Sequence, residues 1–580
     1  MFQLAVAVYT LLSTTHKKSA FGIVLQLALS SLLDFFSIAS FVPIILLIIH
    51  PGVSLSIPWL NKLYEPAGVN HSIYLAFVLT VLSLLFIFIK TKIQIWLNDL
   101  KTTFAYSVSS DLASRAVTRY FGISYAEFSS TDYSRESNRI ANLPLIFANN
   151  IVIPLGTVIS EILISLFLLS SLVIFNYAVF LFLSLLLIPV LITYRLRQKK
   201  IKQTSQELKA TIPLLLKYTQ QSVESLLEIR IHRKESFFKN RINDAFQRLE
   251  NIFLVDNSNK AIILRTTELI VAVCVGLLLL YSLIKKQSYE DTVLLLALYG
   301  GACFRIVPSI NRIFAALVQI RSNEYVVQEL SGNISHHNNN FEDTDDALPF
   351  NDGIELRKIS FSHPTGQLIL NDTSLVIRRK EKILLTGKSG SGKTSLLLVL
   401  LRFVSEQSGE IVIDGARITP ENTIKWRKLF GYVPQNPVIL DASIIENIAF
   451  GILPEKINRE KISKIITDLN LMKWIDELPE GFNTIIGEKG MRISGGQRQR
   501  IAIARSLYQG AEILLLDEIT NQLDTATRQE IMRTLNDGAL RDKTVIMVSH
   551  TVDEFSLFDS GYLLVNGQLN PLFQNQKSAL

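Results

Sequence analysis

The chain has 580 residues, more than one hydrophobic core usually holds, so at least two domains are expected. It is 48% hydrophobic with a mean hydropathy of +0.30, both high for a soluble protein. The net charge of +7 does not indicate nucleic-acid binding, because Lys and Arg flank apolar segments and form no single basic stripe. The only cysteines, Cys274 and Cys303, both lie inside apolar segments, so neither a disulfide scaffold nor a Cys-ligated zinc site is implied.

The N-terminal half is dominated by apolar segments of the length that a membrane-spanning helix needs, about twenty residues. Residues 2–12 are apolar and precede a basic cluster, the reverse of a signal peptide, so we expect an interfacial helix there. Lys and Arg follow the second, fourth and sixth spans, which predicts that the N-terminus and the two long connections are cytoplasmic. The six predicted spans are 21–49, 72–89, 151–174, 177–194, 262–284 and 292–318.

The connections between spans define the domain organisation. Those after the second and fourth spans run to about 60 residues each with almost no Gly or Pro, which predicts helices that extend beyond the membrane. Their tips are expected near residues 130–137 and 224–230, where a solvated helix face is the alternative interpretation. A polar, acidic stretch then precedes alternating strand and helix patterns. We therefore predict an all-α membrane domain (1–325), a linker (326–349) and an α/β domain (350–580).

Residues 387–394, Gly-Lys-Ser-Gly-Ser-Gly-Lys-Thr, follow an apolar strand and open a helix, which is the context of a P-loop. Its backbone N–H groups and Lys393 suit the β- and γ-phosphates of ATP, and the Thr394 hydroxyl suits Mg²⁺. A Gly-rich turn without a ligand is the alternative. The predicted phosphate-binding residues are Gly387, Lys388, Ser389, Gly390, Ser391, Gly392, Lys393 and Thr394.

A second apolar strand, 512–516, ends in Asp517 and Glu518. Asp517 is placed to join the Mg²⁺ shell, and Glu518 to polarise a water for attack on the γ-phosphate. His550 ends the next β-rich run and is predicted to contact the γ-phosphate or the attacking water, although a lone histidine is more often structural. The predicted metal-binding residues are Thr394, Asp517 and Gln435, the last on the resemblance described next.

Residues 493–500, Ile-Ser-Gly-Gly-Gln-Arg-Gln-Arg, resemble the signature motif of ABC ATPases, with Ile in place of the usual Leu. Gln435 in Tyr-Val-Pro-Gln resembles the Q-loop, 487–490 the exporter X-loop, and Leu523-Asp524 the end of the D-loop. The resemblance implies an ABC exporter half-transporter that hydrolyses ATP with Mg²⁺ as a head-to-tail homodimer. It adds Ser494, Gly495, Gly496 and Gln497 as ATP contacts, and Glu518, His550 and Gln435 as catalytic residues.

Two positions depart from the family pattern. His363 occupies the position of the aromatic residue that stacks on adenine, so looser nucleotide binding is expected. Asn521-Gln522 replaces the usual Ser-Ala of the D-loop, which bears only on fine coupling between the two sites.

The transported molecule is the least determined feature. Ionisable residues within the spans are costly and therefore become substrate-pathway candidates, with interhelical salt bridges as the alternative. Residues 57–64 of the first outer loop predict a short amphipathic helix like that of bacterial lipid-linked oligosaccharide flippases (PglK-like). We thus expect a lipid-linked glycan or a similar amphiphile to cross a bacterial inner membrane, with the ATPase domain cytoplasmic. The pathway candidates are Asp34, Glu161, Glu268 and Arg305.

Other functions remain open at this point. A peptide, drug or other lipid exporter has the same fold. An ATP-gated channel or regulator usually carries a damaged ATP site, whereas every hydrolytic residue is present here. A soluble ABC ATPase of DNA repair or translation does not fit six apolar spans.

Overall fold

The computed structural model describes residues 2–41, 44, 71–175, 177–286, 289–331, 346–363, 366–487, 492–520, 525–536, 538–549 and 555–574. Their contacts divide the chain into two compact units. The helical unit comprises Met1–Ile123 and Thr131–Asn339, and the α/β unit comprises Ser124–Ser130 and Asn340–Leu580. Ser124–Ser130, in the first long connection, groups with the α/β unit. This segment lies just before the tip predicted at residues 130–137.

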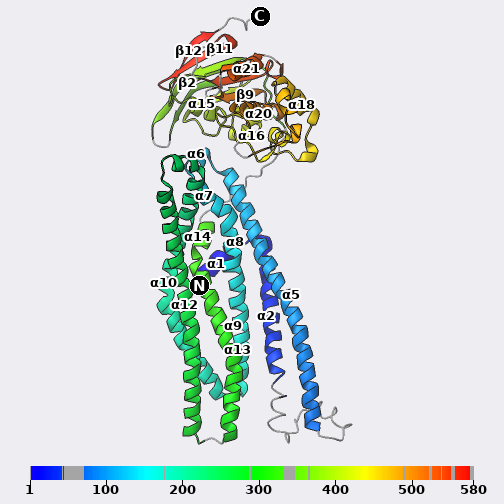
Figure 1. Cartoon of the computed structure of the whole chain (residues 1–580), viewed down its shortest axis with the longest axis vertical. Helices are drawn as coiled ribbons and strands as arrows, with labels where there is room; N and C mark the ends of the chain where they lie inside the picture. Colours follow the sequence, from blue (N-terminus) through cyan, green and yellow to red (C-terminus); the bar gives the residue numbers. More distant parts are fainter. Residues whose placement is uncertain are drawn as a thin grey trace. The chain divides into compact units, whose positions relative to one another are not determined.

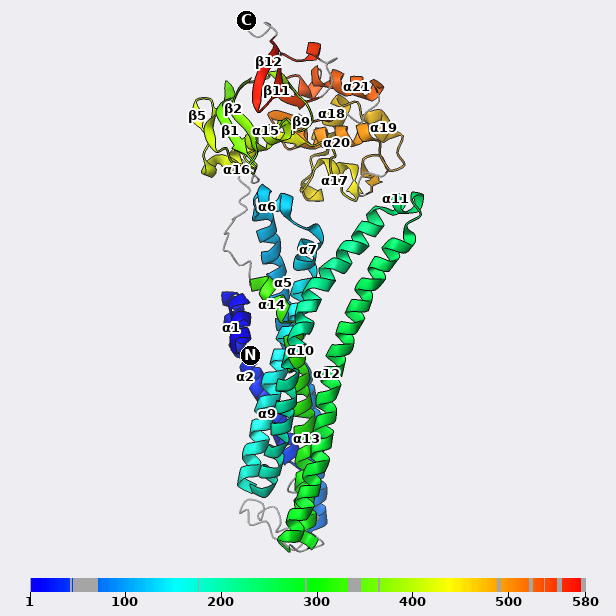
Figure 2. The same ribbon diagram turned by 90° about the vertical axis from the view of Figure 1, so that its left-hand side faces the viewer.

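The helical unit is built from long helices that run side by side (Figures 1 and 2). Six of its described helical segments are long and apolar enough to cross a membrane, which confirms this part of the predicted fold class. Three of them, α5, α10 and α12, are single helices of 52, 48 and 50 residues that continue well past the apolar segment. The long helices are α2 (Thr14–Ala39), α5 (His71–Gly122), α9 (Ile153–Phe175), α10 (Tyr177–Glu224), α12 (Glu235–Ile284) and α13 (Tyr289–Ser322).

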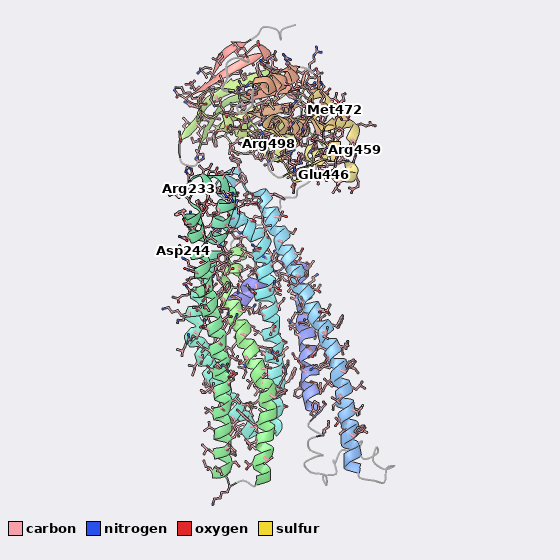
Figure 3. All side chains as sticks on the ribbon, viewed as in Figure 1. Arg233, Asp244, Glu446, Arg459, Met472 and Arg498 are labelled. Atoms are coloured by element: carbon pink, nitrogen blue, oxygen red, sulfur yellow. The ribbon has the colours of Figure 1, made fainter. Side chains whose placement is uncertain are left out.

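Short helices join and brace the long ones. They are α1 (Phe2–Leu11), α7 (Tyr133–Ser137), α8 (Leu143–Phe147), α11 (Leu226–Ile231), α14 (Glu324–Ser331) and the π-helical turns η1 (Asn138–Asn142) and η2 (Ala148–Val152). Leu4, Val8 and Leu11 of α1 are buried in a cluster that also contains Val326 of α14. The predicted interfacial helix thus packs one apolar face on the helical unit and leaves Tyr9 exposed. At the turn between α11 and α12, Arg233 has a left-handed backbone with φ of 52° (Figure 3).

The α/β unit contains two main sheets. The larger has the strand order β12-β11-β3-β10-β9-β6, with β3, β6, β9, β10 and β11 parallel and β12 antiparallel to β11. The smaller, β2-β1-β4-β5, is antiparallel, and β7 pairs with β8. The strands are β1 (Gly353–Ser362), β2 (Leu368–Arg378), β3 (Lys382–Thr386), β4 (Ser408–Ile413), β5 (Ala416–Arg417), β6 (Phe430–Val433), β7 (Ala442–Ser443), β8 (Ile485–Ile486), β9 (Ile513–Asp517), β10 (Thr544–Val548), β11 (Ser560–Val565) and β12 (Gln568–Gln574).

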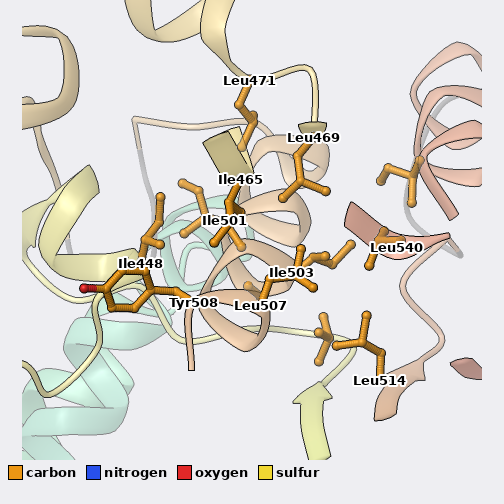
Figure 4. Packing of buried hydrophobic residues seen from close by; sticks show 14 of the residues in the cluster. Ile448, Ile465, Leu469, Leu471, Ile501, Ile503, Leu507, Tyr508, Leu514 and Leu540 are labelled. Atoms are coloured by element: carbon orange, nitrogen blue, oxygen red, sulfur yellow. The ribbon is translucent and has the colours of Figure 1, made fainter. Parts of the chain in front are cut away.

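The central strands β9 and β10 are buried along their whole length, as expected for parallel strands covered by helices. On one side, Ile501, Ile503 and Leu507 of α20 pack in a continuous apolar cluster with Leu514 of β9 (Figure 4). The helices of this unit are α6 (Tyr125–Ser130), α15 (Lys393–Leu400), α16 (Thr423–Arg427), α17 (Ile444–Ile448), α18 (Arg459–Asp468), α19 (Met472–Asp476), α20 (Gly495–Tyr508) and α21 (Thr525–Asn536), with short 3-10 turns at Pro420–Asn422, Pro454–Lys456, Gly481–Asn483, Gly538–Leu540 and Phe555–Leu557.

Candidate functional site

The predicted site residues follow neighbouring parallel strands. The loop 387–392 follows β3, Asp517 ends β9, and Gln435 follows β6 by two residues. Because the carboxyl ends of parallel strands meet at one edge of a sheet, these residues converge there. His550 directly follows the β10 region but lies outside the described residues, so its predicted role stays a prediction.

Glycine is required in the loop between β3 and α15 by backbone geometry and by close packing. Gly390 and Gly392 have left-handed backbones, with φ of 77° and 102°. A Cβ atom on Gly392 would lie 2.7 Å from Ile369 Cγ2, and one on Gly387 would lie 2.8 Å from the Leu564 carbonyl oxygen. The loop therefore curves tightly over the ends of the strands, leaving Lys388, Ser389 and Gly390 exposed.

Two residues of the loop motif begin the helix α15: Lys393, which carries a charge, and Thr394, which carries a hydroxyl group. Lys393 is buried, and its Nζ donates to the carbonyl oxygens of Gly387 and Lys388, each at 3.0 Å. Burial lowers the pKa of Lys393, although the nearby Glu518 and Asp517 oppose this effect. The Thr394 hydroxyl donates to Asp517 Oδ2 over 3.4 Å. Lys393 thus lies near Asp517, and two of the candidate metal ligands, Thr394 and Asp517, are in contact.

Asp517 and Glu518 differ in environment. Asp517 is buried, and burial raises its pKa even though hydrogen bonds from Tyr432 and Thr394 favour the charged form. Glu518 is half-buried and has a left-handed backbone with φ of 52°, a strained conformation for a residue with a side chain. Such strain is typical of functional sites, and here it turns the residue out of line with the strand that precedes it.

Gln435 and Glu518 are joined, because Gln435 Nε2 donates to Glu518 Oε2 over 3.3 Å. The backbone of Gln435 is fixed by α20, where Gln499 Nε2 donates to its carbonyl oxygen over 2.7 Å. A cavity of about 20 Å³ lies between Glu518, Gln435 and Gly495 of α20, enough for one water molecule. Neither the Gln499 contact nor the hydrogen bond from Tyr432 was predicted, since both depend on packing between elements.

Ser494 begins the helix α20 as its N-cap. The Gln497 N–H donates to Ser494 Oγ over 3.2 Å, and the Ser494 N–H donates to Gln497 Oε1 over 2.8 Å, which forms a capping box. Among the described residues, the Ser494 hydroxyl makes no hydrogen bond as a donor, and the helix N-terminus with Gly495 and Gly496 favours an anion. This segment has the properties predicted for a phosphate contact.

His363 is exposed in the turn between β1 and β2. Its N–H donates to the Gln367 carbonyl oxygen over 2.9 Å, and β2 carries the Ile369 side chain that abuts Gly392. The turn is therefore beside the phosphate loop, which is compatible with a base-stacking residue. The X-loop residues Glu488–Gly490, the D-loop segment 521–524 and the outer-loop helix 57–64 lie outside the described residues.

In the helical unit, three of the four pathway candidates form one cluster. Asp34 pairs with Lys90 at 2.6 Å and with Arg305 at 3.0 Å. Glu161 pairs with Arg312 at 2.7 Å and lies 3.9 Å from Arg305. The cluster joins helices α2, α5, α9 and α13 and carries three cations for two carboxylates.

Glu268 lies apart from this cluster, because its ion-pair partner is Arg265 of the same helix at 2.7 Å, with both side chains largely exposed. The predicted alternative of salt bridges between spans therefore holds for Asp34, Glu161 and Arg305 in this conformation. Lys90 and Arg312 were not singled out from the sequence, where both lie near the ends of apolar segments.

The chemistry of the residues present fits ATP with Mg²⁺. Asp517 Oδ1 and Ser391 Oγ are buried and have no hydrogen-bond partner among the described residues. One belongs to the carboxylate whose other oxygen accepts from the Thr394 hydroxyl, and a carboxylate with a hydroxyl is a donor set suited to Mg²⁺. The other is a hydroxyl inside the loop. Both orphaned atoms therefore have the chemistry that a bound metal–phosphate group requires.

Comparison with known proteins identifies what the domain that carries these residues is similar to. Residues 370–521 match the family model described as "ABC transporter". Curated relatives include an ABC multidrug transporter of Emericella nidulans, 36% identical over 231 residues, which are 38% of this chain and 17% of the relative. An ATP-dependent lipid A-core flippase of Pseudoalteromonas translucida is 37% identical over 218 residues, 37% of each chain. The matched region thus spans well under half of either relative.

Among solved structures, the chain resembles that of a bacterial Atm1-family ABC exporter with ATP bound, with a TM-score of 0.73 and 21% identity. The likeness covers 96% of this chain and 94% of that one, so it extends over both units. The predicted fold class is confirmed. Residues 370–521 match the ABC transporter family model, and the chain has the fold of that ABC exporter, with six described helical segments long and apolar enough to cross a membrane and an α/β domain after them.

Proposed function

We propose that the chain is an ATP-driven exporter or flippase that works as a head-to-tail homodimer. The observation that carries this proposal is that one chain holds both the glycine-rich loop 387–394 beside Asp517 and a helix N-terminus capped by Ser494, which is suited to an anion. Within the part of the chain that the structure describes, no hydrogen bond joins the loop to Ser494. A second copy related by two-fold symmetry would supply each loop with the opposite Ser494.

In such a site the side chains would have separate tasks. Lys393 and the loop N–H groups would hold the β- and γ-phosphates, and Thr394 and Asp517 would hold Mg²⁺. When bound, Mg²⁺ neutralises charge on the phosphates. Glu518, oriented by Gln435, accepts a proton from the attacking water. His550 is proposed as a further contact to the γ-phosphate.

The homodimer can be tested with variants that each damage one half of a composite site. Ser494→Arg should block the site of the opposite subunit, and Lys393→Ala the site of its own subunit. In a mixed dimer, one subunit carries Ser494→Arg and the other carries Lys393→Ala. One composite site then has both of its halves damaged, and the other composite site stays intact. Trapping of one nucleotide per dimer supports the arrangement, whereas no trapping in the mixed dimer, with normal trapping in the parent, contradicts it.

For the substrate, we propose an amphiphile such as a lipid-linked oligosaccharide, carried across a bacterial inner membrane with the ATPase domain cytoplasmic. The charged cluster around Arg305 gives the helical unit a polar interior with an excess of positive charge, which suits a polar or anionic head group attached to a lipid tail. One relative is named a lipid A-core flippase, and the outer-loop segment 57–64 resembles the PglK-like flippases.

The substrate test uses the parent protein in liposomes with lipid-linked glycans, peptides and drugs. We expect ATPase stimulation and flipping with a lipid-linked glycan. Replacing Trp59, Leu60 and Leu63 together with Ser should reduce that stimulation and leave basal ATPase unchanged. If peptides or drugs stimulate the ATPase and no lipid-linked glycan does, the proposed substrate class is wrong. The proposed transporter function would be unaffected by that result.

A further inference from the structure

The carboxylate that ends β9 is held at only one of its two oxygens. Tyr432 donates its hydroxyl to Asp517 Oδ2 over 3.1 Å, and Thr394 donates to the same oxygen over 3.4 Å. Asp517 Oδ1 is buried and has no hydrogen-bond partner among the described residues. The side chain is therefore oriented with one oxygen fixed by hydroxyl groups and the other left for a metal ion or its water shell.

Tyr432 is well placed to fix this orientation because it lies on a rigid element. It belongs to β6, which pairs in parallel with β9, so that Tyr432 is opposite Leu515 and Val433 is opposite Leu516. The ring packs against the apolar cluster of the cassette, which restricts its movement. Thr394, by contrast, is exposed at the start of α15 and makes the longer hydrogen bond. The strand register thus delivers the tyrosyl hydroxyl to the end of the neighbouring strand.

We infer that Tyr432 is a positioning residue for the Mg²⁺ site, whose hydroxyl holds Asp517 Oδ2 so that Oδ1 faces the metal. This inference rests on the proposed function, since it presupposes that Asp517 serves Mg²⁺ bound with ATP. Partners that orient metal ligands commonly contribute about 10–100-fold to metal affinity or activity. Loss of the hydroxyl should therefore weaken metal binding much more than it weakens nucleotide binding.

The perturbation must separate the hydroxyl from the ring, because the ring also belongs to the core. Tyr432→Phe removes only the donor and keeps the apolar packing. Tyr508→Phe is the control, since Tyr508 is another tyrosine of the cassette that packs in its core, and its hydroxyl oxygen accepts from the Asn458 N–H over 2.9 Å, outside the metal site. Replacing Tyr432 with 4-aminophenylalanine keeps a ring with a hydrogen-bond donor.

The experiment uses the full-length protein with a non-hydrolysable ATP analogue and Mn²⁺, whose bound fraction is measured by electron paramagnetic resonance. For Tyr432→Phe we expect half-saturating Mn²⁺ to rise about 10-fold. Analogue binding without divalent metal should match the parent and confirm that the cassette is folded. The 4-aminophenylalanine variant should recover most of the Mn²⁺ affinity, and Tyr508→Phe should resemble the parent. In ATPase assays, Tyr432→Phe should need more Mg²⁺ and reach nearly the parent kcat when Mg²⁺ is saturating.

The other outcomes distinguish a failure of the positioning role of Tyr432 from a failure of the proposed function. Parent-like Mn²⁺ affinity in Tyr432→Phe overturns the positioning role and leaves the proposed function standing. An equal loss in Tyr508→Phe shows a general effect of removing a buried hydroxyl and also overturns it. If Tyr432→Phe no longer binds the analogue without metal, the 4-aminophenylalanine variant becomes the test. If that variant is folded and its Mn²⁺ affinity is still no better than that of Tyr432→Phe, the positioning role is refuted. If the parent itself binds no analogue and no Mn²⁺, the proposed function fails, and this inference fails with it.

Discussion

Glu329 of α14 offers a quantitative test of how the helical unit is held together. Its carboxylate pairs with Lys209 at 2.9 Å, Arg135 at 3.1 Å and Arg139 at 3.2 Å, and its side chain is only 11% exposed. These partners come from α10, α7 and the π-helical turn η1, and they line a cavity of about 360 Å³ together with Tyr325. The change Glu329→Gln keeps the size of the side chain and removes its charge, so it isolates the electrostatic contribution.

The three pairs differ in expected strength because their burial differs. Arg139 is 11% exposed, whereas Lys209 and Arg135 are 43% and 56% exposed. Removing one partner of a buried pair costs about 3–5 kcal/mol, and an exposed pair contributes about 0–1 kcal/mol. Arg139 keeps Glu136 as a second partner, which favours the lower end of the range. We expect Glu329→Gln to destabilise the helical unit by about 3 kcal/mol.

The loss should depend on pH in a defined direction. Burial raises the pKa of Glu329, but hydrogen bonds and charge from Lys209 and Arg135 outweigh it and leave the pKa below its ordinary value. A carboxyl group whose pKa is lower in the folded state stabilises the fold above its unfolded pKa, about 4.3, and this contribution disappears as pH falls through the folded pKa. The difference between parent and variant should be complete at pH 7 and shrink only below about pH 4.

The assay is thermal unfolding of the full-length protein in detergent at pH 7, 5 and 4. We expect the melting temperature of the variant to fall by several degrees at pH 7 and pH 5. Glu268→Gln is the control, because the exposed pair between Glu268 and Arg265 should contribute little. An unchanged melting temperature in Glu329→Gln, or an equal fall in the control, would refute the claim that this cluster stabilises the unit.

Two further predictions concern the ATP site. Glu518→Gln should lower kcat by about 10²–10⁴-fold and leave ATP binding intact, because the carboxylate acts on water while the loop holds phosphate. Measurements of ATP turnover and of nucleotide binding on the same variant check this, and parent-like turnover counts against it. His363→Tyr should tighten ATP binding severalfold, since the larger ring gains stacking on adenine; equilibrium binding of ATP and GTP measures it, and unchanged affinity shows that residue 363 does not stack.

Much of the fold could be predicted because hydropathy and strand patterns are local properties. The apolar segments fixed the existence of the long helices, and the scarcity of Gly and Pro predicted their extension beyond the membrane. The ends of the spans were less predictable: the first was expected at 21–49, whereas α2 begins at Thr14 and ends at Ala39. Polar residues such as Lys17 and Lys18 continue the helix beyond its apolar segment, so hydropathy alone does not locate the helix end.

The candidate site likewise contains residues whose place the sequence predicts and contacts that depend on packing between elements. Motifs at strand ends were predictable, because parallel strands deliver Lys393 and Asp517 to one edge whatever the loops between them. The hydrogen bond from Tyr432 to Asp517 was not, since it depends on the pairing of β6 with β9 and on the length of one side chain. Within the spans, the sequence identified ionisable residues, but only helix packing decides that Glu161 faces Arg305 while Glu268 does not.

The contact between α6 and the cassette leads to the last prediction. The Tyr125 ring lies 6.2 Å from that of Phe403, and the Arg427 guanidinium lies 4.6 Å over the same Phe403 ring. Arg427 also donates to the carbonyl oxygens of Leu401 and Arg402, just after the end of α15.

Because α15 begins with Lys393 and spans eight residues, about 12 Å, a displacement of its far end by α6 is carried to the phosphate loop. Tyr125→Ala removes the ring that makes this contact and changes none of the residues predicted to bind ATP or Mg²⁺. It should abolish most substrate stimulation of ATPase while basal ATPase and ATP affinity stay near parent values, measured in the same liposomes. Tyr133→Ala, an exposed tyrosine of α7, is the control. Full stimulation in Tyr125→Ala would show that α6 acts on the cassette by another route.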